Sequence, residues 1–206
     1  QLPSVALELI NTALQKHAGA LKTLDVRSIA PVLSVLPRLR RLTLRSPEAA
    51  VLSSGKGHRN LRSINVRARC VGVVRCLGGL IASCPRLTDV TFGCDGRVAD
   101  QEWIDFSAGI AGCQRLRRVS FHLPQDATSF DALCRALIGH KDLTSLRLTC
   151  PERFDVPPLA AAISGLPRLR KLEVMGLRGV FSEDTAVALC VAIGKLTELR
   201  ELQLAS

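Results

Sequence analysis

The side chains in this sequence that could do chemistry are mostly cationic. Lysine and arginine total 28 against 18 acidic residues, which gives a formal net charge of +10. The excess is uneven, because residues 1–103 carry 15 basic and 7 acidic side chains, whereas residues 104–206 carry 13 and 11. A basic half of this kind favours acidic protein surfaces, nucleic acid or anionic lipid as partners. The alternative is a solvated surface that is simply rich in arginine.

Patterns for catalysis or metal binding are missing from the sequence. The four histidines are scattered, and there is no H-E-x-x-H motif and no C-x-x-C pair. We therefore expect no enzyme activity, no metal site, no cofactor and no small-molecule substrate. Several of the eight cysteines occupy apolar-face positions, which predicts free, buried thiols and an intracellular, reducing compartment. The cysteines are Cys70, Cys76, Cys84, Cys94, Cys113, Cys134, Cys150 and Cys190.

One six-residue phrase recurs along the chain: a leucine, two variable residues, an aliphatic residue, one variable residue and an apolar residue. We call its first residue the leading leucine. The alternation inside the phrase predicts a short strand with one face buried. Successive copies are 18, 22, 26, 29, 27, 26 and 30 residues apart. The leading leucines are Leu21, Leu39, Leu61, Leu87, Leu116, Leu143, Leu169 and Leu199.

The longer gaps between the phrases have the apolar spacing of helices. The first two gaps are too short for a full helix, so we expect a single turn or an extended segment near 31–36 and 47–52. A strand–helix unit cannot bury its own apolar face, so the units should stack. Stacking predicts an α/β solenoid with parallel strands on a concave face and helices on a convex face. The predicted helices lie near 4–19, 71–83, 100–112, 131–137, 157–165 and 182–194.

The phrase L-x-x-L-x-L resembles the leucine-rich repeat, and the length of the units with helices is similar to its ribonuclease-inhibitor-like subclass. The resemblance runs from Leu21 to Leu204 and implies a horseshoe formed by a single array of about eight repeats over residues 1–206. The repeats around Cys84 and Cys113 are also similar to the cysteine-containing repeats of F-box receptors. The simpler explanation is a small apolar slot, which leucine fills at the same offset in other repeats.

In such a solenoid, the second, fourth and sixth residues after each leading leucine face the concave side. The sixth position begins with Arg27, Arg45 and Arg67, which neighbouring strands would place about 4.8 Å apart. Guanidinium groups at that spacing repel one another unless an anion or a carboxylate lies between them. We therefore expect an acidic ligand here; otherwise, the three side chains splay into water. The candidate partner-binding residues are Arg27, Arg41, Arg45, Arg67, Arg118, His122 and Arg147.

A second set of arginines flanks the leading leucines, so stacking should place them along one edge of the array. The favoured explanation is structural, because a cation after a helix stabilises the helix dipole by about 0.3–1 kcal/mol. These residues are Arg38, Arg40, Arg62, Arg86, Arg115, Arg117, Arg168, Arg170 and Arg200.

These patterns together predict a non-catalytic scaffold for protein–protein interaction, which presents a concave, partly basic surface to an acidic partner. One alternative is the substrate-recognition repeats of an F-box-type ubiquitin ligase receptor. Another is a structural subunit of a large ribonucleoprotein or organellar assembly, although no motif supports nucleic acid as a partner and aromatics are only 3% of residues. Uncharged stretches are too short to cross a membrane. The chain begins with Gln1 and stops just after a phrase, so we expect a fragment of a longer protein.

Overall fold

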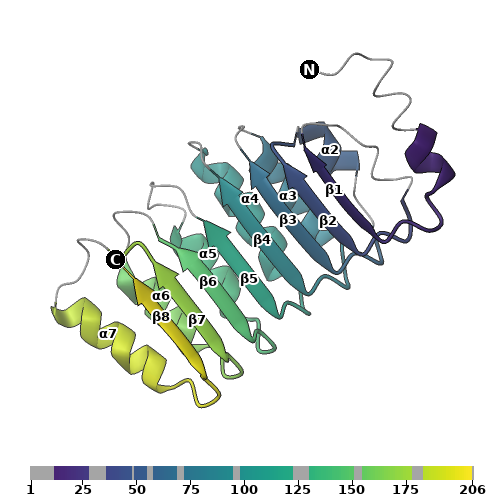
Figure 1. Ribbon diagram of the computed structural model, residues 1–206. Helices are drawn as coiled ribbons and strands as arrows, with labels where there is room; N and C mark the ends of the chain where they lie inside the picture. The colour runs from purple at the N-terminus through teal and green to yellow at the C-terminus, as the bar shows by residue number, and fades with distance from the viewer. Residues whose placement is uncertain are drawn as a thin grey trace.

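The computed structural model describes residues 12–27, 36–47, 49–54, 58–68, 72–94, 98–122, 130–150, 155–177 and 183–205. The described strands form a single parallel sheet whose spatial order is the order of the chain (Figure 1). Each strand begins two residues after a leading leucine, as the repeated phrase predicts. The strands are β1 (Thr23–Arg27), β2 (Arg41–Arg45), β3 (Ser63–Ala68), β4 (Asp89–Cys94), β5 (Arg118–His122), β6 (Ser145–Thr149), β7 (Lys171–Met175) and β8 (Glu201–Ala205).

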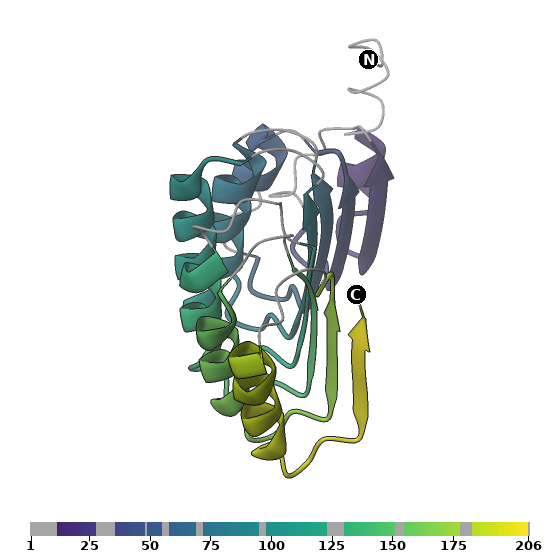
Figure 2. The same cartoon turned by 90° about the vertical axis from the view of Figure 1, so that its left-hand side faces the viewer.

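Helices cover one face of this sheet and leave the other face open. Figure 2 shows the two layers edge-on, with β1 and β8 farther from the helix layer than the middle strands, so that the open face is concave. The α/β leucine-rich-repeat solenoid expected from the sequence is therefore confirmed. The labelled helices are α2 (Ala49–Ser54), α3 (Val73–Ala82), α4 (Asp100–Ala111), α5 (Phe130–Leu137), α6 (Val156–Ser164) and α7 (Glu183–Gly194).

Local sequence explains where several helices begin. Asp100 and Glu102 lie in the first turn of α4, and Glu183 and Asp184 lie in that of α7, where carboxylates favour the helix dipole. Helix α6 begins with proline at its first positions, where the missing N–H has no helical partner to lose. Within the described residues, no helix has the length and apolarity needed to cross a membrane.

The structure of the short gaps between the first phrases agrees in part with the single turn or extended segment expected there. The single turn or extended segment predicted near 47–52 is the six-residue helix α2. The segment predicted near 31–36 lies outside the described residues, except for Leu36. Of the helix predicted near 4–19, residues 12–16 are described and helical.

The core is built from the inward-facing strand residues of successive repeats. In β2, Arg41 and Arg45 are exposed, whereas Leu42 and Leu44 are 1% and 2% exposed. Leu42 aligns with Ile64 of β3, and equivalent aliphatic residues continue through β7. Burying such a side chain contributes about 1.5–3 kcal/mol, so each repeat is stabilised mainly by its neighbours.

The last repeat shows what happens when a neighbour is missing on one side of a strand. Leu202 and Leu204 occupy the inward positions of β8, yet they are 48% and 43% exposed. Val187 and Val191 of α7 are also exposed on this side, each at 56%. The described array therefore ends on an apolar face.

A buried column lies three residues before the leading leucines, where each helix turns toward its strand. Leucine occupies it in the outer repeats, as Leu36, Leu166 and Leu196, and polar residues occupy it in the middle repeats. The Cys113 thiol donates to the backbone carbonyl of Ile81 in the preceding repeat, at 3.3 Å. These cysteines therefore occupy the same buried slot that leucine fills in other repeats, and Cys113 also forms a hydrogen bond there. The polar members are His58, Cys84, Cys113 and His140.

The aromatic residues of the middle repeats are packed inside the array. Trp103 of α4 is 2% exposed, and its ring centroid lies 5.7 Å from that of Phe92 and 5.6 Å from that of Phe106. Phe106 in turn lies 5.4 Å from Phe121 of the next strand. Edge-to-face contacts of this kind stabilise the junction of β4, β5 and α4.

Helices α3 and α4 approach each other at two glycines. A Cβ built on Gly109 would lie 2.3 Å from the carbonyl oxygen of Gly78, and one built on Gly78 would lie 2.7 Å from the backbone of Asp105 and Phe106. Both contacts are with backbone, which cannot move aside as a side chain could. A side chain at either glycine would therefore push the two helices apart.

We predict that Gly109→Ala lowers the free energy of unfolding by at least about 2 kcal/mol, because the added methyl group overpacks the α3–α4 contact. Urea denaturation followed by circular dichroism measures this change. Gly139→Ala is the matched control, since no atom lies within 4 Å of its added Cβ. Equal stability of the two variants would show that the helices tolerate a wider spacing.

We also predict that stability falls as the pH drops below about 6.5, because burial lowers the pKa of His140 below its ordinary value of 6.5. The unfolded chain then binds a proton that the folded chain excludes, and the loss approaches about 1.4 kcal/mol per pH unit. His140→Leu, which copies the outer repeats, should flatten the profile between pH 7 and pH 5. His17→Gln, at an exposed position, is the control, and parallel profiles for wild type and His140→Leu would contradict this assignment.

Candidate partner-binding surface

The open face of the sheet carries the arginine column that the sequence predicts. Arg27 pairs with Arg45 in the β1–β2 register, and Arg45 pairs with Arg67 in the β2–β3 register. The same position continues with Gly93 and then His122. Because the strands are parallel and in register, the backbones of these residues lie side by side, and the side chains of Arg45, Arg67 and His122 are exposed there.

Two grooves on this face contain most of the candidate residues. A groove of about 870 Å³ at the start of the strands is lined by Arg41, Arg118 and Arg147. A second groove of about 450 Å³ toward the ends of the strands is lined by Arg45, Arg67, His122 and Arg147. Arg27 is the last residue of β1, the first strand of the sheet, and its backbone lies beside that of Arg45 in β2.

Charge on the concave face is unevenly compensated. In the first three repeats, the only carboxylate among the concave residues is Asp25, whose oxygen is 3.9 Å from the Arg45 guanidinium. Neither Arg41 nor Arg67 forms an ion pair with any other described residue. This end of the face therefore carries excess positive charge.

The C-terminal end of the concave face is neutralised from within. Glu173 is 3.2 Å from Arg147 and 3.0 Å from Lys171, and its side chain is only 12% exposed. Lys171 also contacts Glu201 at 2.7 Å. These hydrogen bonds to Glu201 and Glu173 raise the pKa of the Lys171 ammonium. Two cations and two carboxylates thus cancel, so Arg147 offers less free charge to a partner than the sequence suggested.

Arg118, in the middle of the face, is also paired. Its guanidinium contacts the carboxylate of Asp89 in the preceding strand, and this hydrogen bond raises the pKa of Arg118. Thr88 donates a hydrogen bond to the same carboxylate at 2.6 Å. His122 is exposed, and a Cβ built on Gly93 would lie 3.5 Å from the Cβ of His122.

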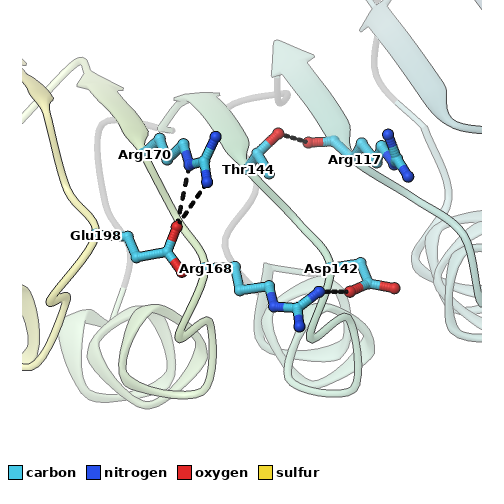
Figure 3. Close-up of polar contacts among 6 residues, drawn as sticks. All are labelled: Arg117, Asp142, Thr144, Arg168, Arg170 and Glu198. Atoms are coloured by element: carbon cyan, nitrogen blue, oxygen red, sulfur yellow. Dashed lines mark hydrogen bonds and ion pairs between the residues drawn. The ribbon is translucent and has the colours of Figure 1, made fainter.

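The second set of arginines lies where the sequence predicts, along one edge of the array. We call this row, formed by the residues that flank the leading leucines, the strand-start edge. Figure 3 shows its C-terminal part, where Arg168 bonds Asp142 at 2.6 Å and Arg170 bonds Glu198 through two nitrogens at 3.0 Å. None of the described edge arginines donates to a helix carbonyl. The helix-dipole explanation thus has no direct contact to support it.

Sequence reasoning missed the carboxylates that decide which arginines are free. Asp89, Asp142, Glu173 and Glu198 each lie about one repeat away from their arginine partner, so no local motif joins them. A signal was nevertheless available. Once the phrases are aligned in register, an acidic residue in one repeat stands beside a basic residue in the next.

The cysteines do not offer a reactive site in the middle of the array. Five of the described thiols are buried, and Cys70 lies outside the described residues. Burial raises the pKa of Cys84 to about 11 and that of Cys113 and Cys150 to about 12, so these thiols stay protonated and are weak nucleophiles at neutral pH. The expectation of uniformly buried thiols is wrong for Cys190, which is exposed on α7, and for the half-buried Cys76. No cluster of metal-ligating side chains occurs among the residues with described positions.

Comparison with known proteins supports the fold. No known protein family matches the sequence, and no curated protein matches it either. Among solved structures, internalin C2 of Listeria monocytogenes, a leucine-rich-repeat protein, is similar with a TM-score of 0.54 and 16% sequence identity. The similarity covers 93% of this chain and 84% of that chain. At this identity the likeness establishes the leucine-rich-repeat fold and leaves function to be argued from the surface.

We predict that a thiol reagent modifies Cys190 rapidly in the native protein, whereas Cys113 reacts only after denaturation. The reason is that Cys190 is exposed on α7, while Cys113 is buried and bonded to Ile81. Labelling followed by peptide mass spectrometry assigns each modified residue. Cys190→Ser should remove the fast reaction at that site, and fast native labelling of Cys113 would mean that the middle repeats open readily.

Proposed function

We propose that the chain is a non-catalytic scaffold that binds a protein with an acidic surface through its concave face. The observation that supports this proposal is the strand register, which pairs Arg27 with Arg45 and Arg45 with Arg67; among the described concave side chains of these three strands, Asp25 is the only carboxylate. An ordered row of guanidinium groups binds carboxylates in a defined geometry. The stacked array fixes the backbone positions of these three residues before any partner binds.

The remaining candidate residues extend the same surface. Arg41 lies in the strand-start groove and is free of ion pairs among the described residues, while His122 adds a polar side chain at the other end. Arg118 and Arg147 lie in the same grooves but already hold carboxylates. We therefore place the strongest contacts at Arg27, Arg41, Arg45 and Arg67.

Two narrower functions remain as alternatives. A substrate receptor of F-box type rests only on the similarity of the repeats around Cys84 and Cys113, and it requires an adaptor-binding segment elsewhere in the protein. A structural role in a ribonucleoprotein or organellar assembly rests on the net charge of +10. That role requires binding that weakens steeply with salt, because each phosphate contact releases counterions.

Two further assignments stay predictions. The ribonuclease-inhibitor-like subclass rests on repeat spacings of 26–30 residues that leave room for a helix. An intracellular, reducing location rests on seven described cysteines that are all unpaired thiols.

The proposal predicts that the triple variant Arg27→Gln, Arg45→Gln, Arg67→Gln binds its protein partner with an affinity at least about tenfold lower, because three charge-assisted contacts disappear. Capture from an extract of the source cells, quantified by mass spectrometry against wild type, measures the loss. Arg75→Gln, Arg135→Gln, Lys195→Gln removes the same charge outside the concave face and should retain the partner. Equal recovery by the concave variant, or equal loss by the control, would exclude the concave column as the binding site.

A further inference from the structure

The strand-start edge has a rigid backbone frame. The Arg62 amide donates to the carbonyl of Arg40 at 2.9 Å, and the Arg117 amide donates to the carbonyl of Thr88 at 2.8 Å. The Thr144 hydroxyl also donates to the carbonyl of Arg117 at 3.0 Å. The Thr88 hydroxyl, which donates to Asp89, lies 3.1 Å from the carbonyl of Arg62. The threonine side chains are therefore held against the backbone and leave space between the arginines.

That space is a groove of about 760 Å³ at the edge of repeats 3 to 6. Two aspartates also line it, but both are engaged: Asp89 with Arg118 and Thr88, and Asp142 with Arg168 at 2.6 Å. The lining arginines are Arg62, Arg86, Arg115, Arg117 and Arg118.

Four of these guanidinium groups have no carboxylate among the described residues. Arg86 donates only to the neutral amide oxygen of Asn60, at 3.3 Å. Arg62, Arg115 and Arg117 are exposed, and their guanidinium groups form no ion pair or hydrogen bond within the described part of the chain. In Figure 3 the Arg117 guanidinium lies apart from Asp142, which bonds Arg168 instead.

The chain itself shows which ligand such arginines take. Arg170 follows a leading leucine, and Glu198, which precedes the next leading leucine, supplies its carboxylate. Arg62 holds the equivalent position in an earlier repeat. In that earlier repeat, Arg86 occupies the position that corresponds to Glu198, so the position carries a cation and not an anion. Arg62 therefore lacks the carboxylate that Glu198 provides to Arg170. For Arg117 the corresponding residue is Asp142, whose carboxylate bonds Arg168 instead.

We propose that the groove lined by Arg62, Arg86, Arg115 and Arg117 binds a short acidic segment of a partner protein, whose carboxylates bond these guanidinium groups as Glu198 bonds Arg170. The inference rests on the proposed function as a protein-binding array, and it assigns a second contact surface beside the concave face.

The dimensions of the groove favour a peptide over nucleic acid. Arg62 and Arg117 are two strand spacings apart, about 10 Å, which matches about three residues of an extended peptide. A nucleic-acid interface is generally larger, and single-stranded binding uses exposed aromatic rings. The described aromatic side chains, which are Phe92, Trp103, Phe106, Phe121 and Phe130, are all buried.

The test is fluorescence anisotropy of a labelled oligoglutamate peptide at low ionic strength. We expect Arg62→Gln, Arg115→Gln, Arg117→Gln to weaken binding about tenfold, as expected for the loss of several exposed charge pairs. The charge-matched variant Arg75→Gln, Arg135→Gln, Lys195→Gln should change it less than about twofold. Absence of peptide binding, or equal weakening by the two variants, would overturn the proposal.

A single substitution tests the internal analogy directly. Arg86→Glu places a carboxylate next to Arg62, in the position that Glu198 has next to Arg170. It should therefore weaken peptide binding more strongly than Arg86→Gln does. Equal effects of the two substitutions would mean that Arg62 is not a ligand. Thermal unfolding checks that both variants remain folded.

Two further measurements separate this inference from the proposed function. If the concave variant Arg27→Gln, Arg45→Gln, Arg67→Gln loses the peptide while the edge variant keeps it, acidic ligands bind the concave face and the edge groove has no role. An oligouridylate probe that binds more tightly than oligoglutamate, and is lost in the edge variant, would identify the groove as a phosphate site and contradict the acidic-peptide assignment.

Discussion

The whole structure depends on the contact between neighbouring repeats. An inward-facing leucine such as Leu42 or Leu146 is buried because the strand before it and the strand after it both supply aliphatic partners. In the last strand, Leu202 and Leu204 have a neighbouring strand on one side only, and they are partly exposed for that reason. Stability in such an array is close to a sum over adjacent pairs, with no single central core.

The same stacking converts sequence positions into columns of like residues. On the concave face it aligns Arg27, Arg45 and Arg67, and on the strand-start edge it aligns arginines with the carboxylates of adjacent repeats. A cation in one repeat is neutralised only when the next repeat carries an acid within reach. An arginine is therefore left without an internal partner where the acids are missing and is paired where Glu173 or Glu198 is present.

The middle repeats differ from the outer repeats in their interior as well. The column before the leading leucines changes from leucine to His58, Cys84, Cys113 and His140, and the Cys113 thiol is bonded to the preceding repeat. The α3–α4 contact is also tightest here, through Gly78 and Gly109. The side chains of this column and the two glycines set the spacing of the middle repeats, whose strand-start edge carries the uncompensated arginines.

The sequence alone determined the architecture, because the spacing of the leading leucines is a local property that can be read without knowing any contact. Within the described residues it located the eight strands, the longer helices and the face that carries Arg27, Arg45 and Arg67. It did not determine which arginines are free, because that depends on acids about one repeat away, such as Glu173 for Arg147 and Glu198 for Arg170. Only the tertiary structure sets those distances, since strand register and side-chain reach decide whether a carboxylate meets a guanidinium or leaves it to a partner.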